Sequence, residues 1–201
     1  MYKMTDKLIL SETWRWDKDT DELIDVSSEP PTRYPASSFD AKVAVYEARV
    51  REWFLDLAQS YVAGGQSRAD YVALSIALAY IEGVEQYRQG RKTPKAQAGA
   101  WFKASAQRIF PAVSADAIDR LWKEARCGLF HCGFPEGRTY LSHDYRQAIA
   151  IKQGDLQIDP LRFIKAVVSD FTAYVKELRA SHNEDLRRRF EKLWDYRWHN
   201  S

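Results

Sequence analysis

Apolar residues recur every three or four positions through much of the chain after residue 37, and this spacing predicts amphipathic helices. The first helix is expected over residues 38–62, where Ser38 or Asp40 can cap the N-terminus. Its buried stripe is expected to consist of Val43, Tyr46, Val50, Trp53, Phe54, Leu57 and Tyr61.

A second helix, expected over residues 68–89, is apolar on most of its faces, which is typical of a central helix. The same spacing predicts further helices over residues 94–110, 114–131, 159–179 and 183–198. Residues 148–158 change to an alternating pattern around Gly154, which predicts a short β-hairpin.

Residues 1–37 differ from the rest because neither the helical nor the strand period persists there. The segment carries Trp14 and Trp16, an acidic stretch and several prolines. We expect an N-terminal arm with one short element, closed by a proline-rich connector. The arm either wraps onto the core through its tryptophans or reaches a partner chain.

These elements together predict an all-α fold, a helical bundle of five to six helices with one small β-hairpin. Residues 38–201 are expected to form this helical domain, preceded by the arm of residues 1–37. A chain of 201 residues is long enough to bury one sizeable core.

Composition excludes several classes of protein. Hydrophobic residues make up 45% and charged residues 29%, which argues against a mainly disordered chain. The net charge of +2 gives no strong overall field towards nucleic acid or membranes, so any anion binding would depend on local clusters. The sequence shows neither an apolar run of the roughly 18 residues that span a bilayer nor a signal peptide, and two cysteines make no disulfide framework. We expect a cytoplasmic protein that does not contact membranes.

The densest cluster of reactive side chains lies in residues 124–132, which include Arg126 and His131. Glycine-rich phosphate loops and the motifs of serine hydrolases and zinc proteases are absent from the sequence. An imidazole can transfer a proton at neutral pH, and a guanidinium can hold a phosphate and offset charge in the transition state. Arg126 and His131 therefore supply groups that could cleave RNA without a metal.

The spacing of this pair sets a geometric condition. On a regular helix, residues five apart point about 140° away from each other. Gly128 and the expected helix end at Gly133 permit a distortion that reduces this divergence, and a second chain could also complete the site.

A small zinc site is an alternative explanation of the same cluster. Four residues carry the nitrogen and sulfur atoms that zinc prefers: Cys127, His131, Cys132 and His143. Cys127 and His131 share one helical face, whereas adjacent ligands at 131 and 132 would diverge.

In a third explanation the cluster is structural. Cys127 is then a small buried side chain, and Arg126 pairs with Glu124 or Glu82. Glu82 and Glu85 lie in the apolar second helix, where a carboxylate needs a partner.

A basic run on the last helix is a further candidate site. Arg187, Arg188 and Arg189 lie opposite its apolar stripe and could follow a phosphate backbone. The alternative is a solvated surface balanced by Glu184 and Asp185.

Residues 121–131, with the sequence LWKEARCGLFH, resemble the Arg-x4–6-His signature of HEPN domains. The expected hairpin and the Asp159-Pro160 start of the next helix also look like HEPN-like bacterial proteins, so the resemblance covers roughly residues 40–180. It implies a helical fold and a homodimer. For many members it also implies metal-independent endoribonuclease activity, without a cofactor, in toxin–antitoxin and related defence systems.

Carried over to this sequence, the resemblance places Arg126 and His131 at an active site on the dimer interface. It also implies a supporting acidic residue from an earlier helix, for which Glu82 and Glu85 are the candidates. Cys127 occupies a position where family members often have Asn, which favours the alternative of a non-catalytic dimerisation or nucleic-acid-binding module. The expected partners are a second copy, RNA, and an antitoxin or other protein.

Overall fold

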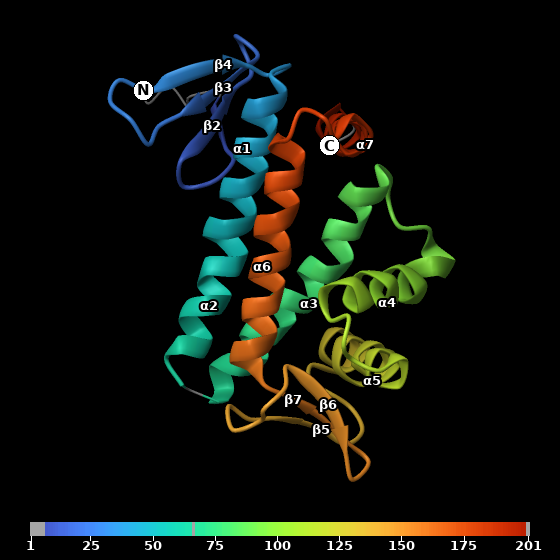
Figure 1. Ribbon diagram of the computed structural model, residues 1–201. Coiled ribbons are helices and arrows are strands. Elements are labelled where there is room, and N and C mark those ends of the chain that lie inside the picture. Colours follow the sequence, from blue (N-terminus) through green and yellow to red (C-terminus); the bar gives the residue numbers. More distant parts are fainter. Residues whose placement is uncertain (1–6, 66, 200–201) are drawn as a thin grey trace.

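A computed structural model describes residues 7–65 and 67–199 of the chain. The N-terminal segment forms a four-stranded antiparallel sheet in the order β1-β2-β3-β4 (Figure 1). Its strands are β1 (Lys7–Ile9), β2 (Trp14–Asp17), β3 (Glu22–Asp25) and β4 (Thr32–Pro35). Trp14 and Leu23 are buried and pack the sheet against the helices. The segment expected to be an arm is therefore a sheet joined to the main core.

The central helices lie side by side along the long direction of the molecule (Figure 1). They are α1 (Phe39–Val50), α2 (Asp56–Ala63), α3 (Ser67–Gln89) and α6 (Pro160–Arg179), and α7 (Glu184–His199) lies across one end of them, where Figure 1 shows it end-on. The hydroxyl of Ser38 accepts the N–H of Ala41 and caps α1, and Asp159 caps α6 in the same way through the N–H of Arg162. Ser38 and Asp159 thus begin helices as the sequence predicts.

A π-helical turn, η1 (Arg51–Leu55), joins α1 to α2 and changes which residues are buried. A π-helical turn contains more residues than a regular turn, so every later position rotates relative to the core. The expected stripe continues through Phe54, Leu57 and Tyr61, and these three side chains are exposed. The residue that follows each of them in the sequence is buried instead: Leu55, Ala58 and Val62.

A second sheet lies at the end of the helices opposite the first sheet (Figure 1). Its strands are β5 (Thr139–Leu141), β6 (Ile149–Lys152) and β7 (Asp155–Ile158), in the order β5-β7-β6. The pair β6–β7 is antiparallel and confirms the predicted hairpin, and β5 adds a parallel strand to it.

The expectation of an all-α bundle with one hairpin is wrong, because helices combine with two sheets. All the described strands have only three or four residues, so the alternating pattern is short everywhere, and only the pair around Gly154 is marked by a glycine turn. Tertiary contacts with the helices stabilise such short strands more than local preference does.

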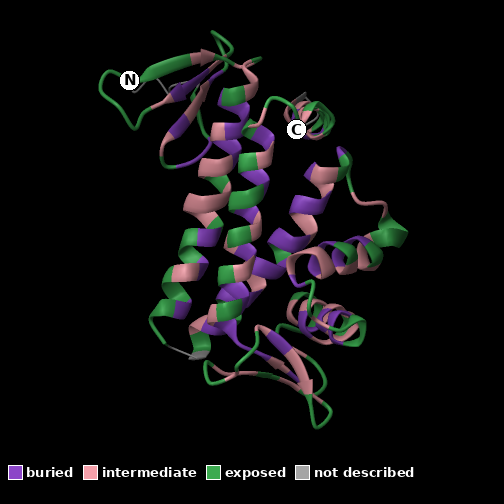
Figure 2. Ribbon diagram, in the orientation of Figure 1, coloured by how far each residue is buried: buried purple, intermediate pink, exposed green. Residues whose placement is uncertain are grey.

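The core runs along α3 and the inner faces of α1 and α6 (Figure 2). Large aromatic side chains fill it: Tyr46, Phe102, Phe163, Phe171, Tyr174 and Phe190. On one side, α4 (Ala98–Ile109) follows the short 3-10 turn η2 (Lys95–Gln97) and packs on α3. Within the described ranges, no helix has the length and apolar character needed to cross a bilayer.

Candidate functional site

The Arg126–His131 segment lies on a helix that widens into π-helical turns. The helix begins as α5 (Ala115–Arg120), capped by the hydroxyl of Ser114, and continues as η3 (Leu121–Arg126) and η4 (Gly128–Cys132). In a π-helical turn each N–H bonds to the carbonyl five residues earlier, as the N–H of Cys127 does to Trp122. In such turns, residues five apart diverge less than they do on a regular helix.

Arg126 reaches across to α3. Its Nη2 donates to Oε2 of Glu82 at 2.7 Å, and both side chains are about four-fifths buried. The guanidinium carbon also lies over two rings, 5.0 Å from the centroid of Trp122 and 4.8 Å from that of Phe130. These contacts hold the arginine in one orientation before any ligand arrives.

His131 is exposed, and two exposed aromatic residues lie close to it in the sequence. Phe130 is 46% exposed and Phe134 is 63% exposed. These two residues are not among the site residues predicted from the sequence. The sequence signal for them is their position at the helix end: Phe130 precedes and Phe134 follows Gly133, whose left-handed φ of 82° ends the helix.

Gly128 allows the chain after the helix to fold back against it. A Cβ added at this position would lie 2.6 Å from both the carbonyl oxygen of Phe134 and the backbone nitrogen of Glu136. The returning segment is held by a hydrogen bond from the N–H of Glu136 to the carbonyl of Glu124, at 2.8 Å. Close backbone approach therefore requires a glycine here.

The carboxylate of Glu124 fastens the same helix to the second sheet. It accepts hydrogen bonds from Arg120 Nη2 at 2.9 Å and from the hydroxyl of Thr139 at 3.0 Å. The hydrogen bond from Arg120 lowers the pKa of Glu124, the bond from Thr139 adds to it, and burial opposes both. The helix end that carries His131 is thus fixed at two points, through Glu82 and through Glu124.

The two candidate supporting carboxylates have different partners. Glu82 contacts Arg126, as described above. Glu85 is buried, accepts a hydrogen bond from Gln89 at 2.8 Å and lies 3.8 Å from Arg108 of α4. Only Glu82, of this pair, belongs to the candidate site.

The four residues of the predicted zinc site are not brought together. Nε2 of His143 lies 3.0 Å from both carboxylate oxygens of buried Asp70, and Cys132 donates its thiol to Glu136 at 2.8 Å. This hydrogen bond raises the pKa of Cys132. In the part of the chain that the structure describes, no group of three or more His, Cys, Asp or Glu side chains is placed to hold a metal ion.

The basic run on α7 is largely engaged within the chain. Arg187 lies over the ring of Phe39, 3.8 Å from its centroid, and donates to the carbonyl of Leu178 at 2.9 Å. Arg188 and Arg189 both pair with Asp185. The alternative of a balanced surface fits these contacts better than a phosphate-binding patch.

Comparison of the chain with models of protein families, with curated proteins and with solved structures finds no match.

Proposed function

We propose that this protein is a metal-independent endoribonuclease of the HEPN type, which acts as a homodimer with Arg126 and His131 as its catalytic pair. The observation that carries the proposal is the hydrogen bond between Glu82 and Arg126. It joins an acidic residue of an earlier helix to the arginine of the Arg-x4-His motif, which is the arrangement that the resemblance implies.

Arg126 is suited to hold a phosphate. A guanidinium has five N–H donors, and Glu82 is its one hydrogen-bond acceptor among the described residues. The remaining donors can bind phosphate oxygens, and the negative charge of Glu82 fixes the orientation without occupying the whole fork. Charge that develops on the phosphate in the transition state is then stabilised by a group already in place.

His131 supplies the proton transfers. As a base it removes the proton of the ribose 2′-hydroxyl, and the 2′-oxygen forms a bond to phosphorus while the bond from phosphorus to the 5′-oxygen breaks. The protonated imidazole then returns the proton to the leaving 5′-oxygen. The products are a 2′,3′-cyclic phosphate and a 5′-hydroxyl, so no external reactant is consumed.

The exposed rings of Phe130 and Phe134 support RNA as the substrate. Unpaired bases stack on exposed aromatic side chains with little dependence on sequence, and each stacked base contributes about 1–3 kcal/mol. Single-stranded RNA beside these rings would place its backbone next to His131. Binding at such a local site does not require a strong overall charge, and the net charge of this protein is only +2.

A non-catalytic RNA-binding module of the same type is the second candidate function. The observation that favours it is Cys127, which stands directly after the arginine where the resemblance implies a polar residue such as Asn. In this case Arg126 and the aromatic rings bind RNA and His131 transfers no proton.

Incubation of a mixed RNA pool with the protein in EDTA separates the two candidates. We expect the wild type to release fragments with 2′,3′-cyclic phosphate ends and His131→Ala to release none. His182→Ala, which removes an exposed histidine at the start of the last helical region, is the matched control and should cleave like the wild type. Circular dichroism establishes that each variant is folded.

Binding of RNA without cleavage by the wild type would support the module and overturn the enzyme. Equal cleavage by wild type and His131→Ala would remove His131 from the mechanism. Neither binding nor cleavage of RNA would contradict both candidates.

A further inference from the structure

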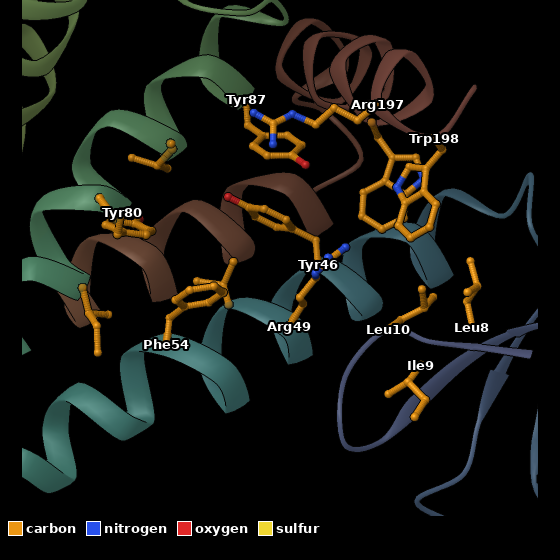
Figure 3. Close-up of a pocket in the computed structure, with 16 residues that line it drawn as sticks. Leu8, Ile9, Leu10, Tyr46, Arg49, Phe54, Tyr80, Tyr87, Arg197 and Trp198 are labelled. Atoms are coloured by element: carbon orange, nitrogen blue, oxygen red, sulfur yellow. The ribbon is translucent and has the colours of Figure 1, made fainter. Parts of the chain in front are cut away.

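A second site is suggested by a cavity of about 610 Å³, located between α1, η1, α3 and α7 and bordered by the first strand of the N-terminal sheet. Phe54 and Tyr80 lie towards one end, and Trp198 and the strand residues Leu8 and Ile9 towards the other (Figure 3). This volume falls within the range of small-molecule sites, which is about 300–1,000 Å³. The cavity is lined by residues other than Arg126 and His131, so its function would be separate from RNA cleavage.

Small residues of α3 form part of the cavity lining. Ala79 and Gly83 are one helical turn apart and both line it. A Cβ added at Gly83 would meet no atom of the described residues within 4 Å, so close packing does not require a glycine there. Glycine inside a helix is unfavourable, and here its effect is to leave the cavity open.

The charged groups of the lining are all positive. Arg49 and Arg197 line the cavity, and none of its lining residues is Asp or Glu. The guanidinium of Arg49 lies over the rings of Trp53 and Trp198, with centroid distances of 5.3 and 5.9 Å. That of Arg197 lies 5.3 Å from the centroid of Tyr87 and donates to Gln86 at 2.8 Å. Stacking on rings orients the guanidinium of Arg49, which keeps its positive charge.

Two tyrosine hydroxyls complete the polar part of the lining. Tyr46 and Tyr87 are 5% and 9% exposed, and their ring centroids are 4.5 Å apart (Figure 3). Both tyrosines line the cavity. Burial raises the pKa of both tyrosines, so their hydroxyls remain protonated and can donate to a ligand.

We propose that this cavity binds a small amphipathic anion, with an apolar body along α3 and a carboxylate or similar anionic group near Arg49, Arg197 and the two tyrosine hydroxyls. The apolar walls match an aliphatic or aromatic body. The positive lining and the protonated hydroxyls match one negative group.

Calorimetric titration of the full-length protein with decanoate tests the proposal, with decan-1-ol as the neutral ligand of equal chain length. We expect decanoate to bind about tenfold or more tightly than decan-1-ol, since only the carboxylate forms charge-assisted hydrogen bonds. Arg49→Gln should reduce this preference. Arg146→Gln, an exposed arginine of a loop outside the cavity, should preserve it and is the matched control.

Gly83→Leu places a side chain into the cavity and should abolish binding of both ligands. Ala79→Leu fills the same space from the neighbouring turn and serves if Gly83→Leu does not fold. Absence of decanoate binding by the wild type would overturn the proposal, as would binding that persists in a folded cavity-filling variant. Equal affinity for decanoate and decan-1-ol would overturn the assignment of an anionic ligand.

Discussion

Glu82 of α3 and Arg126 of η3 are 44 residues apart in the sequence and share a hydrogen bond of 2.7 Å in a partly buried contact. The pair connects the central helix to the helix end that carries His131. Since the rings of Trp122 and Phe130 cover the guanidinium as well, Arg126 has a defined position without any ligand.

A double-mutant cycle with Glu82→Ala and Arg126→Ala measures this contact. Hydrogen bonds to charged groups contribute about 1.5–3 kcal/mol, and partial exposure lowers the value, so we expect a coupling free energy of about 1–2 kcal/mol in urea unfolding. Additive effects of the two substitutions would show that the contact contributes nothing to stability.

The long helices of this protein were predictable because their patterns span several turns. The helices expected to begin at residues 38, 114 and 159 start at those positions, where Ser38, Ser114 and Asp159 are the observed caps. The π-helical turn η1 was not predictable, because one additional residue in a turn leaves no recognisable signal in the sequence. Because of this turn, the expected burial of Phe54, Leu57 and Tyr61 is wrong, and the residue that follows each of them is buried instead.

The candidate site was predicted in part. Arg126 and His131 could be selected by residue type and spacing, but the sequence alone could not decide between Glu82 and Glu85 as the carboxylate that meets the arginine. Both lie on one helix within a single turn, and the placement of α4 decides, because Arg108 of α4 approaches Glu85. The cavity beside Gly83 had no signal in the sequence, since its lining comes from segments distant along the chain.

Two glycine substitutions should have opposite effects on stability. Gly83→Ala adds a Cβ in open space inside α3, and the gain in helix preference should stabilise the protein by about 1 kcal/mol. Gly128→Ala places a Cβ 2.6 Å from backbone atoms of the returning segment and should destabilise it by about 1–3 kcal/mol. Thermal unfolding of both variants measures the difference. A stabilising Gly128→Ala would contradict the close approach at the site.

Asp170 of α6 is the centre of a polar network that holds α3, α4 and α6 together. Its carboxylate accepts the hydroxyl of Tyr80 at 2.9 Å and pairs with Arg108, and Arg88 lies 4.0 Å away. Asp170→Ala leaves these groups without their anion and should reduce the free energy of unfolding by about 3 kcal/mol.

Tyr80→Phe is the matched control for that network, because it removes one hydrogen bond and retains the ring and the charges. We expect it to cost about 1 kcal/mol in the same chemical denaturation experiment. Equal losses in the two variants would mean that the ion pair with Arg108 adds no stability.

The hydrogen bond between Arg120 and Glu124 should make stability depend on pH in the acidic range. Because this bond lowers the pKa of Glu124 in the folded protein, the unfolded chain binds the proton more readily between the two pKa values. The stabilisation is complete above the unfolded pKa of about 4.3 and is lost as the pH falls through the lower folded value. Glu124→Gln should therefore show a shallower loss of stability on acidification, measured by urea unfolding at several pH values. Glu29→Gln removes the same charge from an exposed loop and should retain the wild-type slope. An unchanged slope in Glu124→Gln would show that acid unfolding is governed by other carboxylates.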